Sequence, residues 1–370
     1  MNPRYLPLFE TLVFPNGIEL KNRIAIAPMT HYSSNDDGST ADEEFPYVAR
    51  RAKHVGLFLT ACYAVTENGK AYPGEPLLTD DRFVPGIARI AQIIKGCGAA
   101  AVLQLHHGGG VCPPELVPGG DVVAPSAVDT PGRSHVTPRE LSADKIDGII
   151  EAFGEATLRA IDAGFNGVEL HGAYGYLLQQ FLSPYTNRRN DRWRELHSFP
   201  LEVIRKIENV VKSYATEPFL VGYRFTPEEA LSPGLNMAHA LEFTEALVRE
   251  RVDFIDVLVN NYASKPRVGL ADLSEGRLSL ISRQVAGRTV LLGGGSIYRA
   301  EDGLAALQTG VNVITLGREM VMEPEWVEKV AQGKETEIVT TLVGASRCKL
   351  DLPTRFWNTI WSAPGWFPGV

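Results

Sequence analysis

The sequence has few of the features that mark secreted, metal-stapled or membrane proteins. Only four of its 370 residues are cysteines, and Cys62, Cys97, Cys112 and Cys348 stand far apart with no CxxC or CxxH pair. This spacing argues against a disulfide framework, a structural zinc site or an iron–sulfur cluster, so no metal is expected. No apolar run reaches the ~18–20 residues that span a bilayer, and no signal peptide is visible. We therefore expect a cytoplasmic protein with no membrane partner.

Positive charge is also scarce. Lys and Arg total 36 against 44 for Asp and Glu, which gives a formal net charge of −8. A chain that repels phosphate on average is a poor candidate for binding nucleic acid. What the chain does have is 44% hydrophobic residues, enough to bury a large core, and 35 Gly with 24 Pro, which indicates many tight turns.

Short apolar runs recur along the chain between turn residues, and helical spacing fills the intervals between them. The runs are 24–27, 55–61, 100–105, 167–170, 219–223, 254–259, 289–292 and 313–316. Runs that are apolar on both faces are typical of buried parallel strands, so eight of them alternating with helices predict a closed (β/α)8 barrel. The main alternative is a doubly wound sheet, but neither glycine triplet, 108–110 or 293–295, completes its Gly-x-Gly-x-x-Gly fingerprint.

The pattern also divides the chain. Residues 1–335 should form the barrel, with a long excursion at about 106–141 after the third strand and helices after the N-caps Asp81, Ser142 and Asn236. Residues 336–370 form a tail rich in Trp and Phe, which either packs on its own barrel or joins a subunit interface.

In such a barrel the site lies at the carboxyl ends of the strands, and phosphate commonly binds after strands seven and eight. The residues found there are Gly294, Gly295, Ser296, Gly317 and Arg318, which allow close backbone approach and add a fixed positive charge. Polar side chains at the ends of strands three to five extend the same rim, although each alone could be a satisfied core group. They are Gln104, His106, Glu169, His171 and Arg224.

One long motif identifies a relationship. Residues 168–184 read VELHGAYGYLLQQFLSP and are followed by Asn187-Arg188-Arg189. This resembles the active-site signature of the Old Yellow Enzyme family, FMN-dependent ene-reductases built on a (β/α)8 barrel, and the similarity extends from about Phe9 to about Val330. The resemblance implies non-covalent FMN, with NADH or NADPH as the reductant and a small electrophilic molecule as the substrate.

The resemblance also implies cofactor contacts. Pro28, Met29 and Thr30 match the segment along the flavin ring, and Ala61 matches a small residue near its edge. Gln104 and Arg224 match residues on the pyrimidine side of the flavin, where a cation stabilises the reduced, anionic ring. The glycine, serine and arginine positions at the last two strands match the phosphate cradle.

Three residues of the motif carry the implied catalysis. His171 matches the first of two donors to a substrate carbonyl oxygen, and Tyr176 matches the proton donor to the α-carbon of the acceptor. The family's second carbonyl donor is His or Asn, whereas this sequence has Tyr174 in that place. Tyr174 either donates to the oxygen or narrows the pocket, and we expect the narrowing role because the phenol is longer.

Other functions remain open at this point. An NAD(P)H:flavin oxidase or quinone-type reductase would use the same cofactor without a dedicated enone substrate, and a non-catalytic flavin sensor would bind FMN without turnover. A tRNA-modifying flavin barrel is disfavoured by the net charge of −8, and a dienoyl-CoA reductase by the lack of a cysteine cluster after the barrel. The sequence does not decide whether the chain forms a homo-oligomer.

Overall fold

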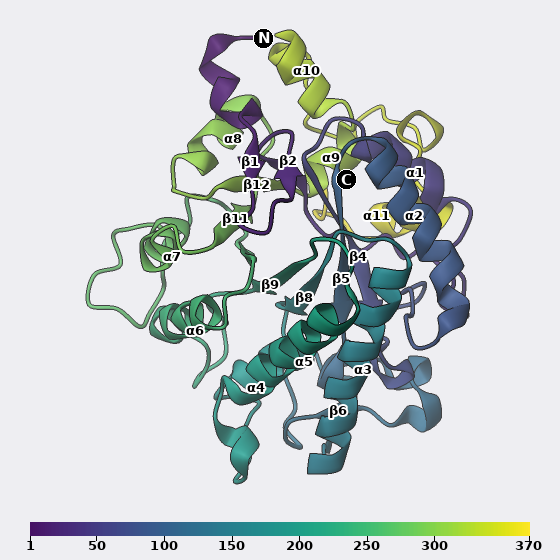
Figure 1. The fold of residues 1–370 in the computed structure, drawn as a ribbon, viewed down its shortest axis with the longest axis vertical. Coiled ribbons are helices and arrows are strands. Elements are labelled where there is room, and N and C mark those ends of the chain that lie inside the picture. Colours follow the sequence, from purple (N-terminus) through teal and green to yellow (C-terminus); the bar gives the residue numbers. More distant parts are fainter.

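The computed structural model describes residues 1–370 and contains a closed barrel of eight parallel strands (Figure 1). In order around the barrel the strands are β10 (Phe254–Val257), β11 (Val290–Gly294), β12 (Val313–Leu316), β3 (Ile24–Ile26), β4 (Leu57–Ala64), β5 (Ala100–His106), β8 (Gly167–Gly172) and β9 (Leu220–Phe225). The barrel closes where β9 pairs with β10, with Gly222 opposite Phe254. The predicted (β/α)8 barrel is confirmed, and each expected apolar run lies on one of these strands.

Helices surround the barrel and carry their apolar residues on the inner face. They are α1 (Glu44–Ala52), α2 (Val84–Gly96), α3 (Ala143–Asp162), α4 (Leu177–Leu182), α5 (Ser198–Tyr214), α6 (Met237–Arg249), α7 (Arg277–Val285), α8 (Ala300–Leu307), α9 (Arg318–Met322), α10 (Trp326–Gln332) and α11 (Thr354–Ser362).

Two of the three predicted helix starts are confirmed. Asn236 caps α6 by accepting from two backbone N–H groups, and Ser142 directly precedes α3. Asp81 is not an N-cap: a 3-10 turn comes before α2, and Asp80 caps that turn by accepting from the N–H of Arg82. The Asp81 carboxylate instead pairs with Arg159, 2.9 Å away on α3.

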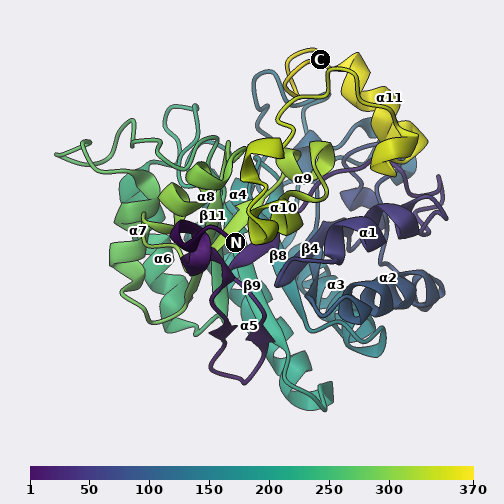
Figure 2. The same cartoon turned by 90° about the horizontal axis from the view of Figure 1, so that it is seen from above.

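A short hairpin closes the end of the barrel at which the strands begin. Its strands β1 (Leu12–Val13) and β2 (Glu19–Leu20) pair antiparallel, and Phe14 and Leu20 join the apolar side chains at the amino ends of the barrel strands. Figure 2 shows this purple hairpin at the opposite end of the molecule from the yellow C-terminal segment. Only the carboxyl end of the barrel is therefore open to a ligand.

The expected excursion after β5 is held against the barrel by residues of α4 and of the segment that follows it. It consists of 3-10 turns and the two-residue strands β6 (Val123–Ala124) and β7 (Arg139–Glu140). Arg189 donates to the carbonyls of Pro125 and Leu141, each at 2.7 Å. Gln180 on α4 accepts from the N–H of Gly110 at 3.0 Å.

The C-terminal tail contacts the barrel of its own chain. Phe356 and Phe367 are buried in the main core, and the ring of Phe356 meets that of Tyr47 at 6.0 Å between centroids. Arg318 donates to the carbonyl of Trp366 at 3.0 Å, which holds the tail beside the end of β12.

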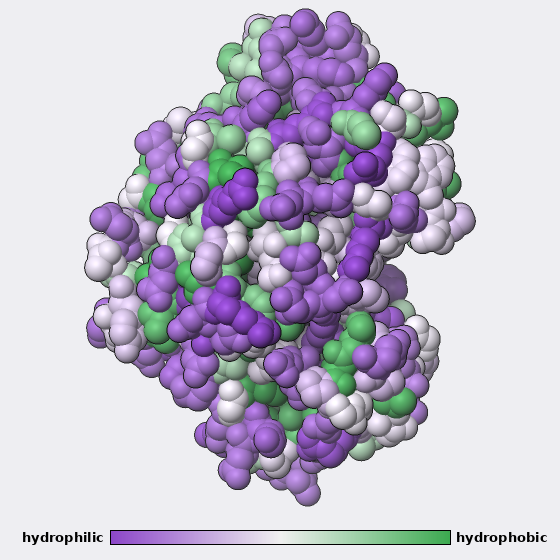
Figure 3. Space-filling view, turned by 90° about the vertical axis from the view of Figure 1, so that its right-hand side faces the viewer, coloured by the Kyte–Doolittle hydropathy of each residue, from purple (hydrophilic) through white to green (hydrophobic).

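None of the helices is long and apolar enough to cross a membrane. The face in Figure 3 is mostly hydrophilic, with apolar residues scattered among hydrophilic ones.

Candidate active site

A cavity of about 630 Å³ opens at the carboxyl end of the barrel. Residues from several barrel strands and from the tail line it, as expected where the strand ends converge. Of the residues predicted to bind cofactor or substrate, the cavity brings together Pro28, Met29, Thr30, Gln104, His171, Tyr174, Tyr176, Arg224, Gly294, Gly295, Ser296, Gly317 and Arg318.

One side of the cavity suits an anion. A Cβ on Gly295 would stand 2.2 Å from the carbonyl oxygen of Val259, and φ is +108° there, so only glycine fits this turn. A Cβ on Gly294 would collide with the carbonyl of Thr315 at the same distance. Arg318 lines the same cavity and donates from Nη1 to a carbonyl of the tail, which leaves its other N–H groups for a phosphate.

Two buried polar pairs surround the place expected for the flavin pyrimidine. Arg224 Nη1 lies 2.7 Å from Asp256 Oδ2, and Gln104 Nε2 donates to Glu169 Oε2 at 2.5 Å. Burial, and then the charge of Asp256, raises the pKa of Glu169 to about 8. Gln104 on β5 lies four strands from β11 and so faces the glycine turn across the mouth of the eight-stranded barrel, whereas Arg224 on β9 is only two strands from β11.

His171, on β8 between β5 and β9, and Tyr176, which follows it, form one wall of the cavity. Their ring centroids are 5.3 Å apart, with the planes at 61°. Burial, and then the Arg224 charge, lowers the pKa of His171 to about 3, and burial raises the pKa of Tyr176. Near neutral pH the imidazole is therefore neutral with one N–H, and the phenol keeps its proton.

Tyr174 differs from these two in both backbone and exposure. It does not continue a helix from His171: it lies in the turn between β8 and α4 at φ +56°, with its N–H 3.3 Å from Thr226 Oγ1. Its side chain is 52% exposed, and its ring centroid is 6.3 Å from that of His171. Tyr174 thus stands at the rim of the cavity.

The residues that line the cavity differ in part from the predicted site residues. Ala61 does not line it, whereas its neighbour Cys62 does. Glu319 and Trp366 also reach the cavity and were missed. Glu319 follows Arg318 directly and could have been found by extending that motif, but the tail carries no sequence signal that places Trp366 beside β12.

Comparison with known proteins identifies the relationship. Residues 7–337 match the sequence profile of the NADH:flavin oxidoreductase / NADH oxidase family. The chain belongs to this family. The "Probable NADH-dependent flavin oxidoreductase YqiG" of Bacillus subtilis is 44% identical over 372 residues, covering 100% of this chain and 99% of that protein.

Two further relatives show the range of the NADH:flavin oxidoreductase family. An NADH:fumarate oxidoreductase of Klebsiella pneumoniae is 35% identical over 95% of this chain, which spans only 38% of that longer protein. Morphinone reductase in complex with tetrahydroNAD superposes with a TM-score of 0.76 at 27% identity, covering 88% of this chain and 91% of the other.

These comparisons confirm the resemblance to the Old Yellow Enzyme family. They also confirm that the protein is an NAD(P)H-dependent flavin oxidoreductase that uses FMN. The cavity fits this cofactor. The cramped glycine turn and Arg318 suit its phosphate, and the buried Gln104 and Arg224 suit the polar edge of its ring.

Proposed function

We propose that the enzyme reduces an activated C=C bond, conjugated to a carbonyl or carboxyl group, in a small molecule. The observation that supports this most directly is the pairing of His171 with Tyr176 on one wall of the FMN cavity, each holding its proton near neutral pH. Such an acceptor needs a hydrogen-bond donor at its oxygen and a proton for its α-carbon.

In the proposed reaction His171 binds the acceptor oxygen. Transfer of hydride, taken from NADH or NADPH, to the β-carbon is the chemistry that FMN supplies when bound. Negative charge then builds on the oxygen, so the His171 N–H stabilises the transition state more than the ground state. Tyr176 gives its phenolic proton to the α-carbon, and Arg224, paired with Asp256, offers positive charge to the reduced cofactor.

The cofactor contacts follow the same assignment. Pro28, Met29 and Thr30 would lie along the flavin ring, Gln104 and Arg224 at its pyrimidine side, and Gly294, Gly295, Ser296, Gly317 and Arg318 at the phosphate. Tyr174 would narrow the entrance. Residues 1–335 would form the catalytic unit and residues 336–370 would cover its open end.

A second candidate function is the oxidation of NAD(P)H with oxygen or a quinone as the acceptor. It is favoured by Tyr174, which replaces the His or Asn donor of the family and is 52% exposed at the rim of the cavity. A relative named NADH oxidase, from Thermoanaerobacter brockii, is 31% identical over 87% of this chain, which spans 50% of that protein.

Anaerobic reoxidation separates the two functions. The enzyme is reduced with one equivalent of NADH or NADPH and mixed with cyclohexenone, fumarate, a soluble quinone or oxygen. We expect an activated alkene to reoxidise the flavin fastest, with formation of the saturated product. Rapid reoxidation by quinone or oxygen, with no alkene consumed, would contradict the proposal.

A further inference from the structure

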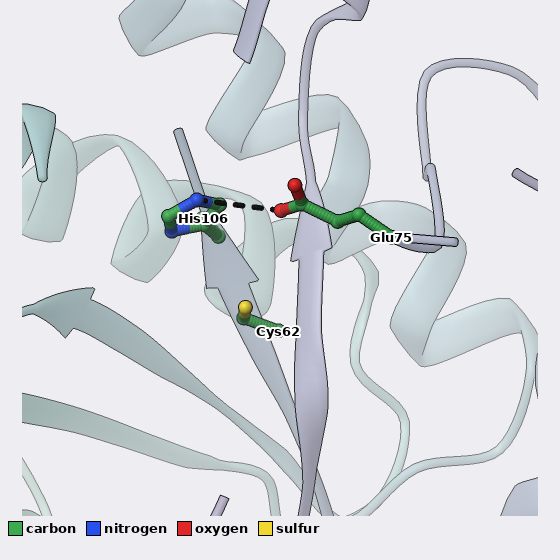
Figure 4. Close-up of side chains that lie close together, drawn as sticks. All are labelled: Cys62, Glu75 and His106. Atoms are coloured by element: carbon green, nitrogen blue, oxygen red, sulfur yellow. Dashed lines mark ion pairs between the residues drawn. The ribbon is translucent and has the colours of Figure 1, made fainter. Parts of the chain in front are cut away.

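Behind the wall of the cavity, three side chains of metal-binding type come together from distant parts of the sequence. Cys62 lies on β4, Glu75 in the segment that follows it, and His106 at the end of β5. Their ligand atoms all lie within 4.8 Å of one another, and all three residues are buried. Figure 4 shows the imidazole and the carboxylate facing each other, with the thiol of Cys62 beside them.

The facing atoms of this cluster have no hydrogen-bond partners. His106 Nε2 is 3.3 Å from Glu75 Oε1, yet neither atom makes a hydrogen bond. Both residues are 0% exposed, and buried polar atoms are nearly always satisfied. Two unsatisfied atoms that face each other and a thiol indicate a binding position for a group that the protein itself does not supply.

The surroundings hold the carboxylate in place. Glu75 Oε2 accepts from the N–H groups of Ala71 at 2.5 Å and Tyr72 at 3.3 Å, which leaves Oε1 directed at His106. The hydroxyl of Tyr72 lies 3.2 Å from Cys62 Sγ. Hydrogen bonds of this kind, from groups behind a ligand, are what orients ligands in metal sites.

We propose that Cys62 Sγ, Glu75 Oε1 and His106 Nε2 bind one divalent transition-metal ion of the zinc class. Sulfur and imidazole ligands select this class over Mg²⁺ or Ca²⁺, which prefer oxygen alone. A thiolate and a carboxylate together neutralise the charge of a divalent ion, as a fully buried site requires. Three protein ligands leave a fourth position for water, as in open zinc sites.

The fold explains why sequence spacing gave no sign of this site. The ligands come from the ends of two neighbouring strands, where Ala64 pairs with His106, and from a loop that returns to the same strand end. His107, adjacent in sequence, takes no part: its Nδ1 accepts from the N–H of Gly109. Cys62 also lines the cavity, which provides an entry path for the ion.

Binding at this site should affect catalysis, a consequence that rests on the proposed function. The His106 ring meets that of Tyr176 edge-on at 4.3 Å between centroids, and His171 lies 5.4 Å away. An ion that fixes His106 restrains the ring against which Tyr176 packs, so it should slow proton delivery by Tyr176 to an alkene.

The test uses the FMN-loaded enzyme equilibrated with Zn²⁺, passed through a desalting column and assayed for metal by mass spectrometry. We expect one Zn²⁺ per chain. Cys62→Ser, Glu75→Gln and His106→Gln should each weaken Zn²⁺ binding by about 100-fold or more, measured by chelator competition. Co²⁺ gives a second readout, because thiolate coordination produces absorption bands beyond those of the flavin.

Cys348→Ser is the matched control, since Cys348 is an exposed thiol far from the cluster in sequence. The flavin spectrum of each variant reports whether the cavity still folds. Less than stoichiometric Zn²⁺ in the wild type, or binding lost in Cys348→Ser but retained in Cys62→Ser, would overturn the metal site. Stoichiometric Zn²⁺ with an unchanged alkene rate would support the site and count against its effect on proton delivery by Tyr176.

Discussion

At the scale of single residues, burial prepares His171 for its proposed role. Removing the imidazole from water lowers its pKa to about 3, so titration of this group lies outside the physiological range. We predict that alkene reduction shows no step from His171 between about pH 5 and 7, where an ordinary histidine would titrate. The measurement is kcat/KM against pH for the wild type and His171→Asn. A step near pH 6.5 present only in the wild type would contradict this.

Tyr174 offers a residue-scale test of its two roles. Because its side chain is 52% exposed, we predict that Tyr174→Phe reduces small enones at nearly the wild-type rate. Tyr174→Asn should accept bulkier enones, and Asn also tolerates the φ of +56° at this position. Steady-state rates on a small and a bulky enone distinguish the roles. A loss of about 10–10³-fold in Tyr174→Phe, with full flavin content, would show that its hydroxyl donates to the substrate.

The site residues that could be predicted lie within a few positions of one another or directly follow a barrel strand. His171, Tyr176 and Arg318 are of this kind. Glu75 is not, because its position depends on a loop folding back onto β4, and nothing local in the sequence specifies that contact. Trp366 reaches the cavity only through the packing of the whole tail.

At the scale of elements, the end of the signature motif has a structural function. Arg189 is buried, donates to two carbonyls of the excursion, and is held in place by two hydrogen bonds to the carboxylate of Asp191. We predict that Arg189→Met speeds amide hydrogen exchange throughout residues 122–142, since its two charge-assisted bonds to the excursion are lost. Arg188→Met is the control, because Arg188 is exposed and its side chain donates only to the carbonyl of Tyr185. Equal exchange in the two variants would exclude this role for Arg189.

The barrel strands could be predicted because each is apolar on both faces and bounded by turn residues. The elements of the excursion could not, since β6 and β7 are two residues long and exist only through their mutual pairing. The start of α2 was predicted two residues early because a 3-10 turn, capped by Asp80, precedes the helix.

At the scale of the whole molecule, a buried carboxyl beside the phosphate side of the cavity should make stability depend on pH. Burial, and then the charge of Glu323, raises the pKa of Glu319 from 4.5 to about 9. The folded protein holds a proton there that the unfolded chain releases. The free energy of unfolding should therefore fall as pH rises between these two values.

We predict that Glu319→Gln, which resembles the protonated acid, raises the melting temperature by a few degrees at pH 8 and by little at pH 4.5. Thermal unfolding of the apoprotein at both pH values provides the measurement. The exposed Glu337→Gln is the control. A gain that is as large at pH 4.5 as at pH 8 would show that charge at Glu319 is not its cause.

The central claim for the whole enzyme is that Tyr176 protonates the alkene after hydride transfer. Stopped-flow absorbance of Tyr176→Phe, followed separately during reduction by NAD(P)H and reoxidation by an alkene, tests it directly, with the exposed Tyr214→Phe as control. We predict flavin reduction at nearly the wild-type rate and alkene-driven reoxidation slower by roughly 10²–10⁴-fold. Equal slowing of both half-reactions, or no slowing of either, would contradict the account.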